Sequence, residues 1–345
     1  MTAAAPPRGR HARTDEAQPV VRPSLLRAEL LRLRSRRMLR VLLALVLLGW
    51  LAGSVISLFS FAKTTPEELD LARQQIAQIV ADNNSYRADC LTDPPDGDLA
   101  ACGPETSASD FSPAQFVSEK PFELGQAGRD GATVVAVGVA VVGVVAAATW
   151  IGGEWSSRSM VGLLFWEPRR WRVHLVKAAV ITIAAVVVAI LVEALWTASA
   201  YALAHLRGDG AAPDGFVGQL LGIEARGVAL VACATLIGYA VAGLIRNTGA
   251  TLGIAFVYFA VVETAVRAIS ESAQAGLITV NAIALVTRGG FVYYTYDDTQ
   301  DASGMYTGTA VEHTVTNLQG GLVLAGVAVA LTAVSGLVLA RRDVQ

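Results

Sequence analysis

Six long runs of uncharged, mostly apolar residues alternate with polar segments along the chain. A helix rises about 1.5 Å per residue, so crossing a hydrocarbon core of about 30 Å takes about 20 residues. Most of the runs reach this length, and the fifth, of 16 residues, reaches it when Glu263 is included. We therefore predict an all-α integral membrane protein with six transmembrane helices, at residues 41–62, 131–152, 176–204, 227–245, 248–269 and 320–340.

The outer segment 270–319 contains a further uncharged run of 16 residues, from Ser272 to Thr287. If this run crossed the membrane, Arg341 and Arg342 of the C-terminal tail 341–345 would lie on the outer side. A run of this length also suits a helix that enters the membrane without crossing it. We therefore expect a re-entrant or interfacial helix here.

Composition and charge agree with a membrane protein and give it an orientation. Of the 345 residues 53% are hydrophobic and 16% are charged, against about 25% charged in soluble domains. With six spans and a cytoplasmic N-terminus, 18 of the 27 Lys and Arg residues fall on the inner side. Inner loops carry an excess of Lys and Arg, so both termini are predicted to be cytoplasmic in a plasma membrane protein. Because successive loops lie on alternating sides of the membrane, the loop 205–226 is predicted to be on the outer side.

The residues before the first span fall into two parts. Residues 1–22 are rich in Ala, Pro and Arg, which predicts a disordered cytoplasmic tail. Residues 23–40 are predicted to form an interfacial amphipathic helix capped by Ser24, with Leu26, Leu30 and Leu33 on one face. Nucleic-acid binding is disfavoured because the segment is tethered at the membrane and has no interleaved aromatic residues.

Residues 63–130 are predicted to form an extracytoplasmic domain with 13 acidic and 5 basic residues. A helix from Thr65 to Ala81 fits a cap at Thr64 or Thr65, Pro66 in the first turn and acidic residues near the N-terminus. Cys90 and Cys102 flank a loop rich in Pro, Asp and Gly on the oxidising side, so we expect a disulfide between them.

Motifs for enzyme chemistry are absent from the sequence. None of the three lysines follows a glycine, which excludes a P-loop for ATP. The sequence contains no His-Glu-x-x-His pair for zinc and no Gly-x-Ser-x-Gly nucleophile turn. We therefore expect no catalytic residue, no metal and no cofactor bound by this chain.

The inner loop 153–172 has a definite pattern. It predicts a short helix with Glu154 near its N-terminus and with Met160, Leu163 and Leu164 on one apolar face. Pro168 ends this helix, and the basic residues that follow lie at headgroup level. The loop's physics alone equally fits a positively charged inner loop with aromatic anchors.

This loop resembles the inner loop of type-two ABC transporter permeases, and the likeness rests on Glu154, Trp155, Ser159, Met160, Leu163, Leu164, Pro168, Arg169, Arg170 and Lys177. Arg158 stands where that family usually has glycine. Ala28-Glu29-Leu30-Leu31, the six spans and the ending Leu339 to Val344 also resemble the family. The resemblance implies an exporter subunit whose coupling helix docks on a separate ATPase subunit. That ATPase would bind ATP and Mg, and a second permease subunit would complete a homodimer or heterodimer.

Two predicted spans contain a carboxylate, Glu193 in the third and Glu263 in the fifth. A charge at the bilayer centre costs about 2.5–3.5 kcal/mol on insertion scales, so each must face protein or water. They could line a substrate path or couple transport to a cation. Alternatively, Glu263 pairs with Arg267 and Glu193 bonds a neighbouring helix. For the whole chain, a polytopic scaffold or sensor whose acidic outer domain, residues 63–130, binds a partner is a second hypothesis, and an ion-coupled carrier using Glu193 is a third.

Overall fold

The computed structural model describes residues 24–94, 99–117, 119–208, 210–300 and 306–341. The predicted disordered tail 1–22 and most of the C-terminal tail lie outside these residues. The structure contains six helices that are long and apolar enough to cross a membrane. The prediction of a helical, multi-pass membrane protein is therefore confirmed. The six are α2 (Arg37–Ser60), Leu124–Ser156 (η5 and α4), α6 (Arg170–Arg207), α7 (Phe216–Ile245), Thr248–Ile269 (α8, η6 and α9) and α11 (Asn317–Arg341).

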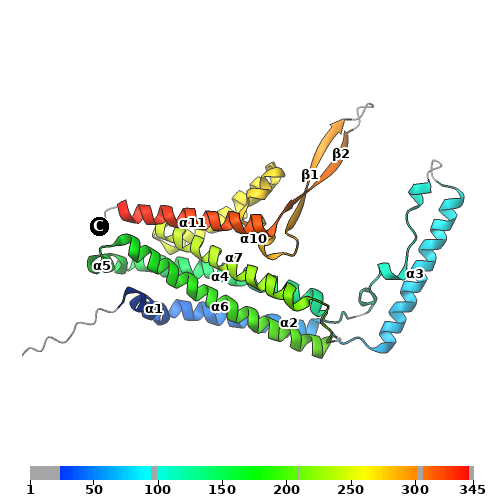
Figure 1. Cartoon of the computed structure of the whole chain (residues 1–345), viewed down its shortest axis with the longest axis horizontal. Helices are drawn as coiled ribbons and strands as arrows, with labels where there is room; N and C mark the ends of the chain where they lie inside the picture. The colour runs from blue at the N-terminus through cyan, green and yellow to red at the C-terminus, as the bar shows by residue number, and fades with distance from the viewer. Residues whose placement is uncertain (1–23, 95–98, 118, 209, 301–305, 342–345) are drawn as a thin grey trace, which may run out of the picture.

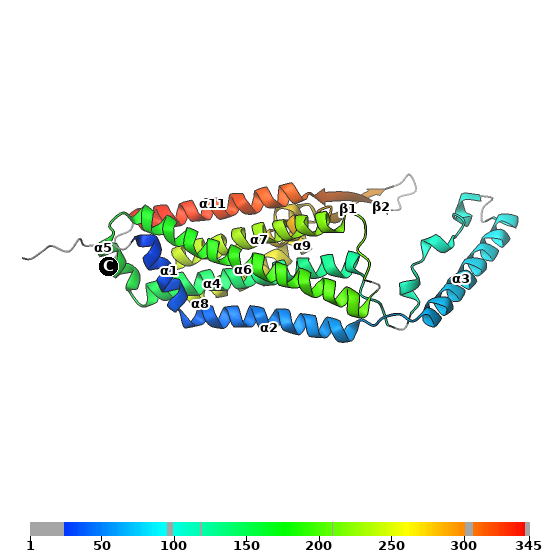
Figure 2. The same ribbon diagram turned by 60° about the horizontal axis from the view of Figure 1, so that its bottom comes forward.

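The spanning helices form one bundle whose two ends differ (Figures 1 and 2). Two short helices, α1 (Leu25–Ser35) and α5 (Ser159–Trp166), lie at the end where α11 finishes. The long helix α3 (Pro66–Thr92) and a β-hairpin lie at the other end. Both described chain termini are therefore at the α1–α5 end.

Helices α4 (Arg129–Ser156) and α7 form the centre of the bundle and pack on each other most extensively. Glycines bring the two backbones close together. A Cβ added to Gly143 would lie 2.3 Å from Thr235 Oγ1, and one added to Gly238 would lie 2.9 Å from the backbone of Val144. Small residues at such crossings are typical of helix packing in membranes. Helices α2 and α8–α9 lie at the periphery and bury little of their length.

Several helices extend beyond the predicted spans. Helix α6 begins at Arg170 rather than 176, and α7 begins at Phe216 rather than 227. Its 38 residues make α6 about 57 Å long, well beyond a bilayer core of about 30 Å. The prediction used charged residues such as Glu224 and Arg226 as boundaries, but charges end the apolar stretch and not the helix.

The N-terminal segment forms two helices at an angle. Ser24 caps α1 by accepting a hydrogen bond from the Arg27 backbone N–H at 3.3 Å, as predicted. Arg36 is extended, with φ −72° and ψ 117°, so the predicted helix 23–40 stops at Ser35 and α2 starts at Arg37. The chain therefore bends at Arg36, five residues before the predicted first span.

Helix α3 and the strand-free segment after it form a separate outer unit. Thr65 and Glu68 cap the helix reciprocally, and both hydrogen bonds from Thr65 lower the pKa of the Glu68 carboxyl. The lowered pKa means that the ionised Glu68 carboxylate stabilises the folded state at neutral pH. This stabilisation is lost as the pH falls through that lowered pKa. The helix runs to Thr92, past the predicted end at residue 81, because the sequence offers no Gly or Pro before Pro94.

The predicted disulfide between Cys90 and Cys102 is confirmed, with the two Cα atoms 5.7 Å apart. It ties the returning segment to the end of α3. Asn84 Nδ2 donates to Thr106 O at 2.9 Å, and the Thr106 backbone N–H donates back to Asn84 Oδ1 at 3.0 Å.

The outer segment 270–319 contains a β-hairpin that the all-α prediction missed. After η7 (Ser272–Gly276) and the short helix α10 (Ile278–Val286), strand β1 (Phe291–Gln300) pairs antiparallel with β2 (Tyr306–Val315). The aromatic and β-branched residues from 291 to 296 favour a strand. Asn317 Nδ2 then donates to the carbonyls of Ala284 at 2.6 Å and Thr287 at 2.7 Å, which fixes α10 to the start of α11.

Replacing Cys90 and Cys102 together with Ser should destabilise the outer unit by about 3 kcal/mol, the entropy of closing so short a loop. Limited proteolysis of the full-length protein in nanodiscs should cut the variant faster between residues 66 and 123. The Cys233→Ser variant is the control, because this cysteine is a free thiol in α7. Equal cleavage rates for all three proteins would contradict the structural role.

Candidate functional site

The structure brings Lys177 between two glutamates at the α1–α5 end of the bundle. Lys177 Nζ lies 2.6 Å from Glu29 Oε2 and 2.7 Å from Glu154 Oε2, the latter an ion pair without hydrogen-bond alignment. Lys177 and Glu29 are fully buried, and Glu154 is 2% exposed. Three elements distant in sequence supply these charges: α1, the end of α4 and the start of α6.

Two arginines and an aromatic ring complete this cluster. Arg32 contacts Glu29 at 2.9 Å, and Arg36 lies 3.7 Å from Glu154. Lys177 Nζ also lies 5.1 Å from the centre of the Trp150 ring. A buried charge costs several kcal/mol unless a partner compensates it. The arrangement therefore favours one position of α1 against α4 and α6.

A second set of buried hydrogen bonds extends the cluster to α7 and α11. Tyr239 Oη donates to the carbonyl oxygen of His174 at 2.8 Å, and His174 Nε2 lies 3.0 Å from the carbonyl oxygen of Thr332. His174 is one turn before Lys177 on α6. Two turns of α6 thus contact four other helices, α1, α4, α7 and α11. A displacement of this part of α6 would change its contacts with all four.

The structure corrects the prediction for Glu154. It lies in the last turn of α4 and not near the N-terminus of the short helix. Helix α4 continues to Ser156, and the chain turns at Arg158, whose φ of 54° is left-handed. Glycine adopts this conformation most readily. The residue that departs from the glycine of the resembling family therefore occupies a position with glycine-like backbone geometry.

The short helix α5 begins immediately after Arg158. Met160 and Leu163 are buried against Val173 of α6 and Leu339 of α11, and Leu164 is half-buried beside them. The apolar face predicted from the sequence is thus directed into the protein itself. Movement of α5 would therefore be transmitted to α6 and α11.

The outward face of α5 carries two aromatic side chains that sequence reasoning did not single out. Phe165 is 84% exposed and Trp166 is 90% exposed. The prediction considered only the apolar face formed by Met160, Leu163 and Leu164. Phe165 and Trp166 follow these residues directly and were not assigned to that face. Exposed apolar side chains of this size mark a contact with a partner or with the membrane interface.

The other predicted loop residues lie before and after α5, and two of them contact neighbouring helices. Trp155 stacks under Arg246, whose guanidinium carbon lies 4.1 Å from the ring centre. Pro168 and Arg169 are exposed between α5 and α6. Arg170 donates to the carbonyls of Leu339 at 3.1 Å and Ala340 at 3.3 Å. These contacts satisfy carbonyls at the C-terminus of α11, where a cation is favourable.

The two carboxylates predicted inside spans have different surroundings. Glu263 is 2% exposed, forms the expected pair with Arg267 at 3.3 Å, and accepts hydrogen bonds from the backbone and hydroxyl of Thr279. Glu193 is 3% exposed, and neither carboxylate oxygen has a hydrogen-bond partner among the described residues. The predicted bond from Glu193 to a neighbouring helix is therefore not formed. A Cβ added to Gly227 of α7 would lie 3.1 Å from Glu193 Oε1.

Glu29 is the main residue that sequence reasoning did not assign to the site. It falls on the same face of α1 as Leu26, Leu30 and Leu33, and a carboxylate on an apolar stripe needs a buried partner. The sequence therefore held a signal for Glu29, but it did not identify Lys177 as the partner.

Replacing Lys177 with Met should destabilise the protein by about 3–5 kcal/mol, because two buried carboxylates lose their shared cation. Thermal unfolding of the purified protein in detergent measures the change. Lys120→Met is the control, because Lys120 is exposed. The triple variant Glu29→Gln, Glu154→Gln, Lys177→Met should recover much of the loss. An unchanged unfolding temperature for the single variant would refute the role of the cluster.

The two membrane carboxylates should respond oppositely to the same substitution. Glu193→Gln replaces a buried carboxyl group that has no hydrogen-bond partner among the described residues, so it should keep or raise the unfolding temperature. Glu263→Gln weakens the contacts to Arg267 and Thr279 and should cost about 1–3 kcal/mol. Each variant is the matched control of the other. A larger loss for Glu193→Gln than for Glu263→Gln would show that Glu193 has a partner.

Within the residues that the structure describes, no group of three or more His, Cys, Asp or Glu side chains could hold a metal ion. Comparison of the chain with protein-family models, curated proteins and solved structures finds no match. Its function must therefore be argued from the site: a buried charge cluster that joins the helices at one end of a membrane bundle, and a short helix that presents two exposed aromatic side chains.

Proposed function

We propose that the chain is the membrane-spanning permease subunit of an ATP-driven ABC exporter in the plasma membrane, with both termini in the cytoplasm. Three features support this: six spanning helices, the α1–α5 end that holds both termini, and the inner-loop resemblance to type-two permeases. The carrying observation is α5 itself. Its inward face packs on the bundle and its outward face presents Phe165 and Trp166.

In this proposal α5 is the coupling helix that transmits the movement of a separate ATPase subunit. Phe165 and Trp166 would enter a pocket on the ATPase, because exposed aromatic side chains are the usual anchors of protein interfaces. Displacement of α5 would be carried by Met160 and Leu163 to α6 and α11. Rigid-body tilting of these helices would then alternate the access of a substrate path.

In this proposal the buried cluster makes α1, α4 and α6 move together. Lys177 connects the base of the loop, through Glu154, with α1, through Glu29. An interface of this kind has discrete arrangements and does not deform continuously. The left-handed Arg158 allows α5 to lie across the end of the bundle, where a partner can reach it.

The energy for transport would come from the partner, which would bind ATP and Mg. This chain has no Gly-Lys sequence for a P-loop. A second permease subunit, either identical or related, would complete the transporter. Helices α2 and α8–α9 bury little surface within this chain and are available for that subunit or for lipid.

Replacing Phe165 and Trp166 together with Ala should weaken binding of the ATPase by at least about 30-fold, the effect of a loss of about 2 kcal/mol at an interface hot spot. Purification of the tagged chain from its own membrane, followed by identification of a bound P-loop protein, supplies the ATPase for the binding measurement. Transport in proteoliposomes should fall in parallel.

The matched control is Leu318→Ala, which removes an apolar side chain that is 73% exposed at the opposite end of the bundle. It should leave binding and transport unchanged. Glu154→Ala and Leu164→Ala act within the protein and should uncouple ATP turnover from transport while the ATPase still binds. Wild-type transport by the Phe165 and Trp166 variant would refute the coupling role of α5.

A polytopic scaffold or sensor is the alternative function. The outer unit around α3, which lies beyond the end of the bundle, favours it (Figure 1). Under that alternative the outer unit binds a partner and no ATPase is retained. A gene for a P-loop ATPase beside the gene for this chain, and an ATPase that stays bound on purification, would support the exporter. The absence of both would support the scaffold or sensor.

A further inference from the structure

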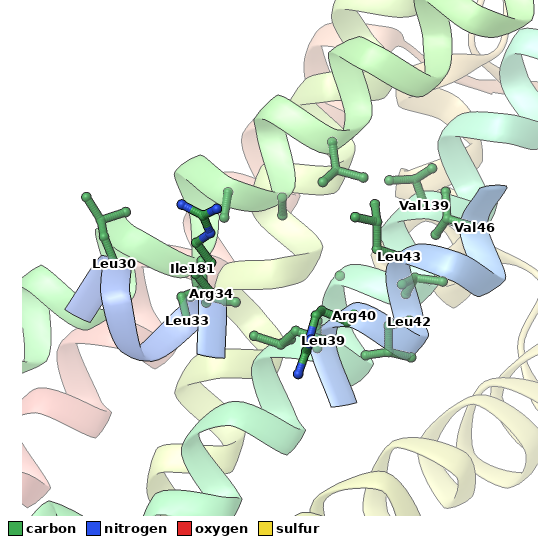
Figure 3. Close-up of a pocket in the computed structure, with 16 residues that line it drawn as sticks. Leu30, Leu33, Arg34, Leu39, Arg40, Leu42, Leu43, Val46, Val139 and Ile181 are labelled. Atoms are coloured by element: carbon green, nitrogen blue, oxygen red, sulfur yellow. The ribbon is translucent and has the colours of Figure 1, made fainter. Parts of the chain in front are cut away.

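An apolar groove of about 510 Å³ lies between the two N-terminal helices and the bundle (Figure 3). Its walls come from α1, α2, α4 and α6, and aliphatic side chains such as Leu33, Leu43, Val139 and Ile181 form most of its surface. Its size is within the range of about 300–1,000 Å³ that is usual for small-molecule sites. Leu30 and Leu43 at its rim are 48% and 43% exposed, so the groove opens on the lipid-facing side of the bundle.

Among the described residues, Arg34 and Arg40 are the only charged residues that line the groove, and no acidic residue lines it. Both are exposed, and neither side chain forms a hydrogen bond or ion pair within the described part of the chain. Their neighbours Arg32 and Arg36, in contrast, contact Glu29 and Glu154. In Figure 3 the side chains of Arg34, from α1, and Arg40, from α2, extend in opposite directions.

We propose that this groove holds one acyl chain of an anionic phospholipid, with the lipid phosphate bound by Arg34 and its negative charge further balanced by Arg40. The bilayer supplies this ligand directly at the groove. An apolar wall without polar partners fits a hydrocarbon chain, and free guanidiniums at the rim complement a phosphodiester. Basic residues near a membrane surface favour anionic lipids in the same way.

The bound lipid would fill the space that separates the bend of α1 and α2 from α4 and α6. It would add apolar contacts to an end of the bundle that the Lys177 cluster already fixes through charges. The inference goes beyond the proposed exporter function, because it needs only that the α1 end lies at a membrane surface. A protein without any ATPase partner could hold the same lipid.

Native mass spectrometry of the full-length protein, after delipidation in mild detergent, tests the proposal. Phosphatidylglycerol and phosphatidylcholine with identical acyl chains are added separately, and bound lipid is counted per chain. One phosphatidylglycerol should be retained in preference to phosphatidylcholine. Arg34→Ala should lower the apparent affinity for phosphatidylglycerol about fivefold, the change produced by about 1 kcal/mol for each basic residue at a membrane surface.

Two matched controls separate the groove from general effects. Arg37→Ala removes an exposed arginine that does not line the groove, and it should leave retention unchanged. Ala184→Phe fills the groove and should abolish retention, whereas Ile183→Phe changes an exposed position on the same helix outside it. Arg34→Ala keeps the proposal testable if Ala184→Phe fails to fold.

Equal retention of the two lipids would overturn the assignment of a headgroup site to Arg34. Retention that Ala184→Phe does not change, or the absence of any retained lipid, would overturn the groove as the lipid site. Dimerisation that protects the groove from added lipid would assign it to a second copy of the chain and would also overturn the proposal.

Discussion

A lysine buried between two glutamates sets the geometry of one end of this protein. Lys177, Glu29 and Glu154 come from three helices, and the bundle interior offers no water to any of them. Each buried glutamate requires a nearby cation, and the buried lysine requires a nearby carboxylate. This requirement fixes α1 across the end of the bundle and holds the last turn of α4 against the start of α6. The groove between α1, α2 and the bundle depends on this position of α1.

A different set of contacts holds the short helix α5 in place. Its eight residues would not form a stable helix alone, because nucleating a turn costs more than a few hydrogen bonds return. Met160 and Leu163 pack α5 against α6 and α11, and the left-handed backbone of Arg158 turns the chain from α4 into α5. A force on its outward aromatic side chains therefore reaches the spanning helices instead of unfolding the loop.

The two ends of the bundle are built by different physical means. Charges and aromatic side chains organise the α1–α5 end, whereas the opposite end uses a disulfide, a capped helix and a hairpin that stand away from the membrane helices. The proposed lipid would add hydrocarbon contacts to the charged end.

The sequence by itself determined the six spanning helices, the caps at Ser24 and Thr65, and the disulfide, because each depends on neighbouring residues or on local apolar length. The aromatic and β-branched residues from 291 to 296 could also have indicated the first strand of the hairpin. Only the tertiary structure decided that Glu29 and Glu154 share Lys177 and that Phe165 and Trp166 point outward. It also decided that Glu263 has hydrogen-bond partners while Glu193 has none among the described residues. These outcomes depend on which helices become neighbours, and neighbours in space are set by packing between segments far apart in the chain.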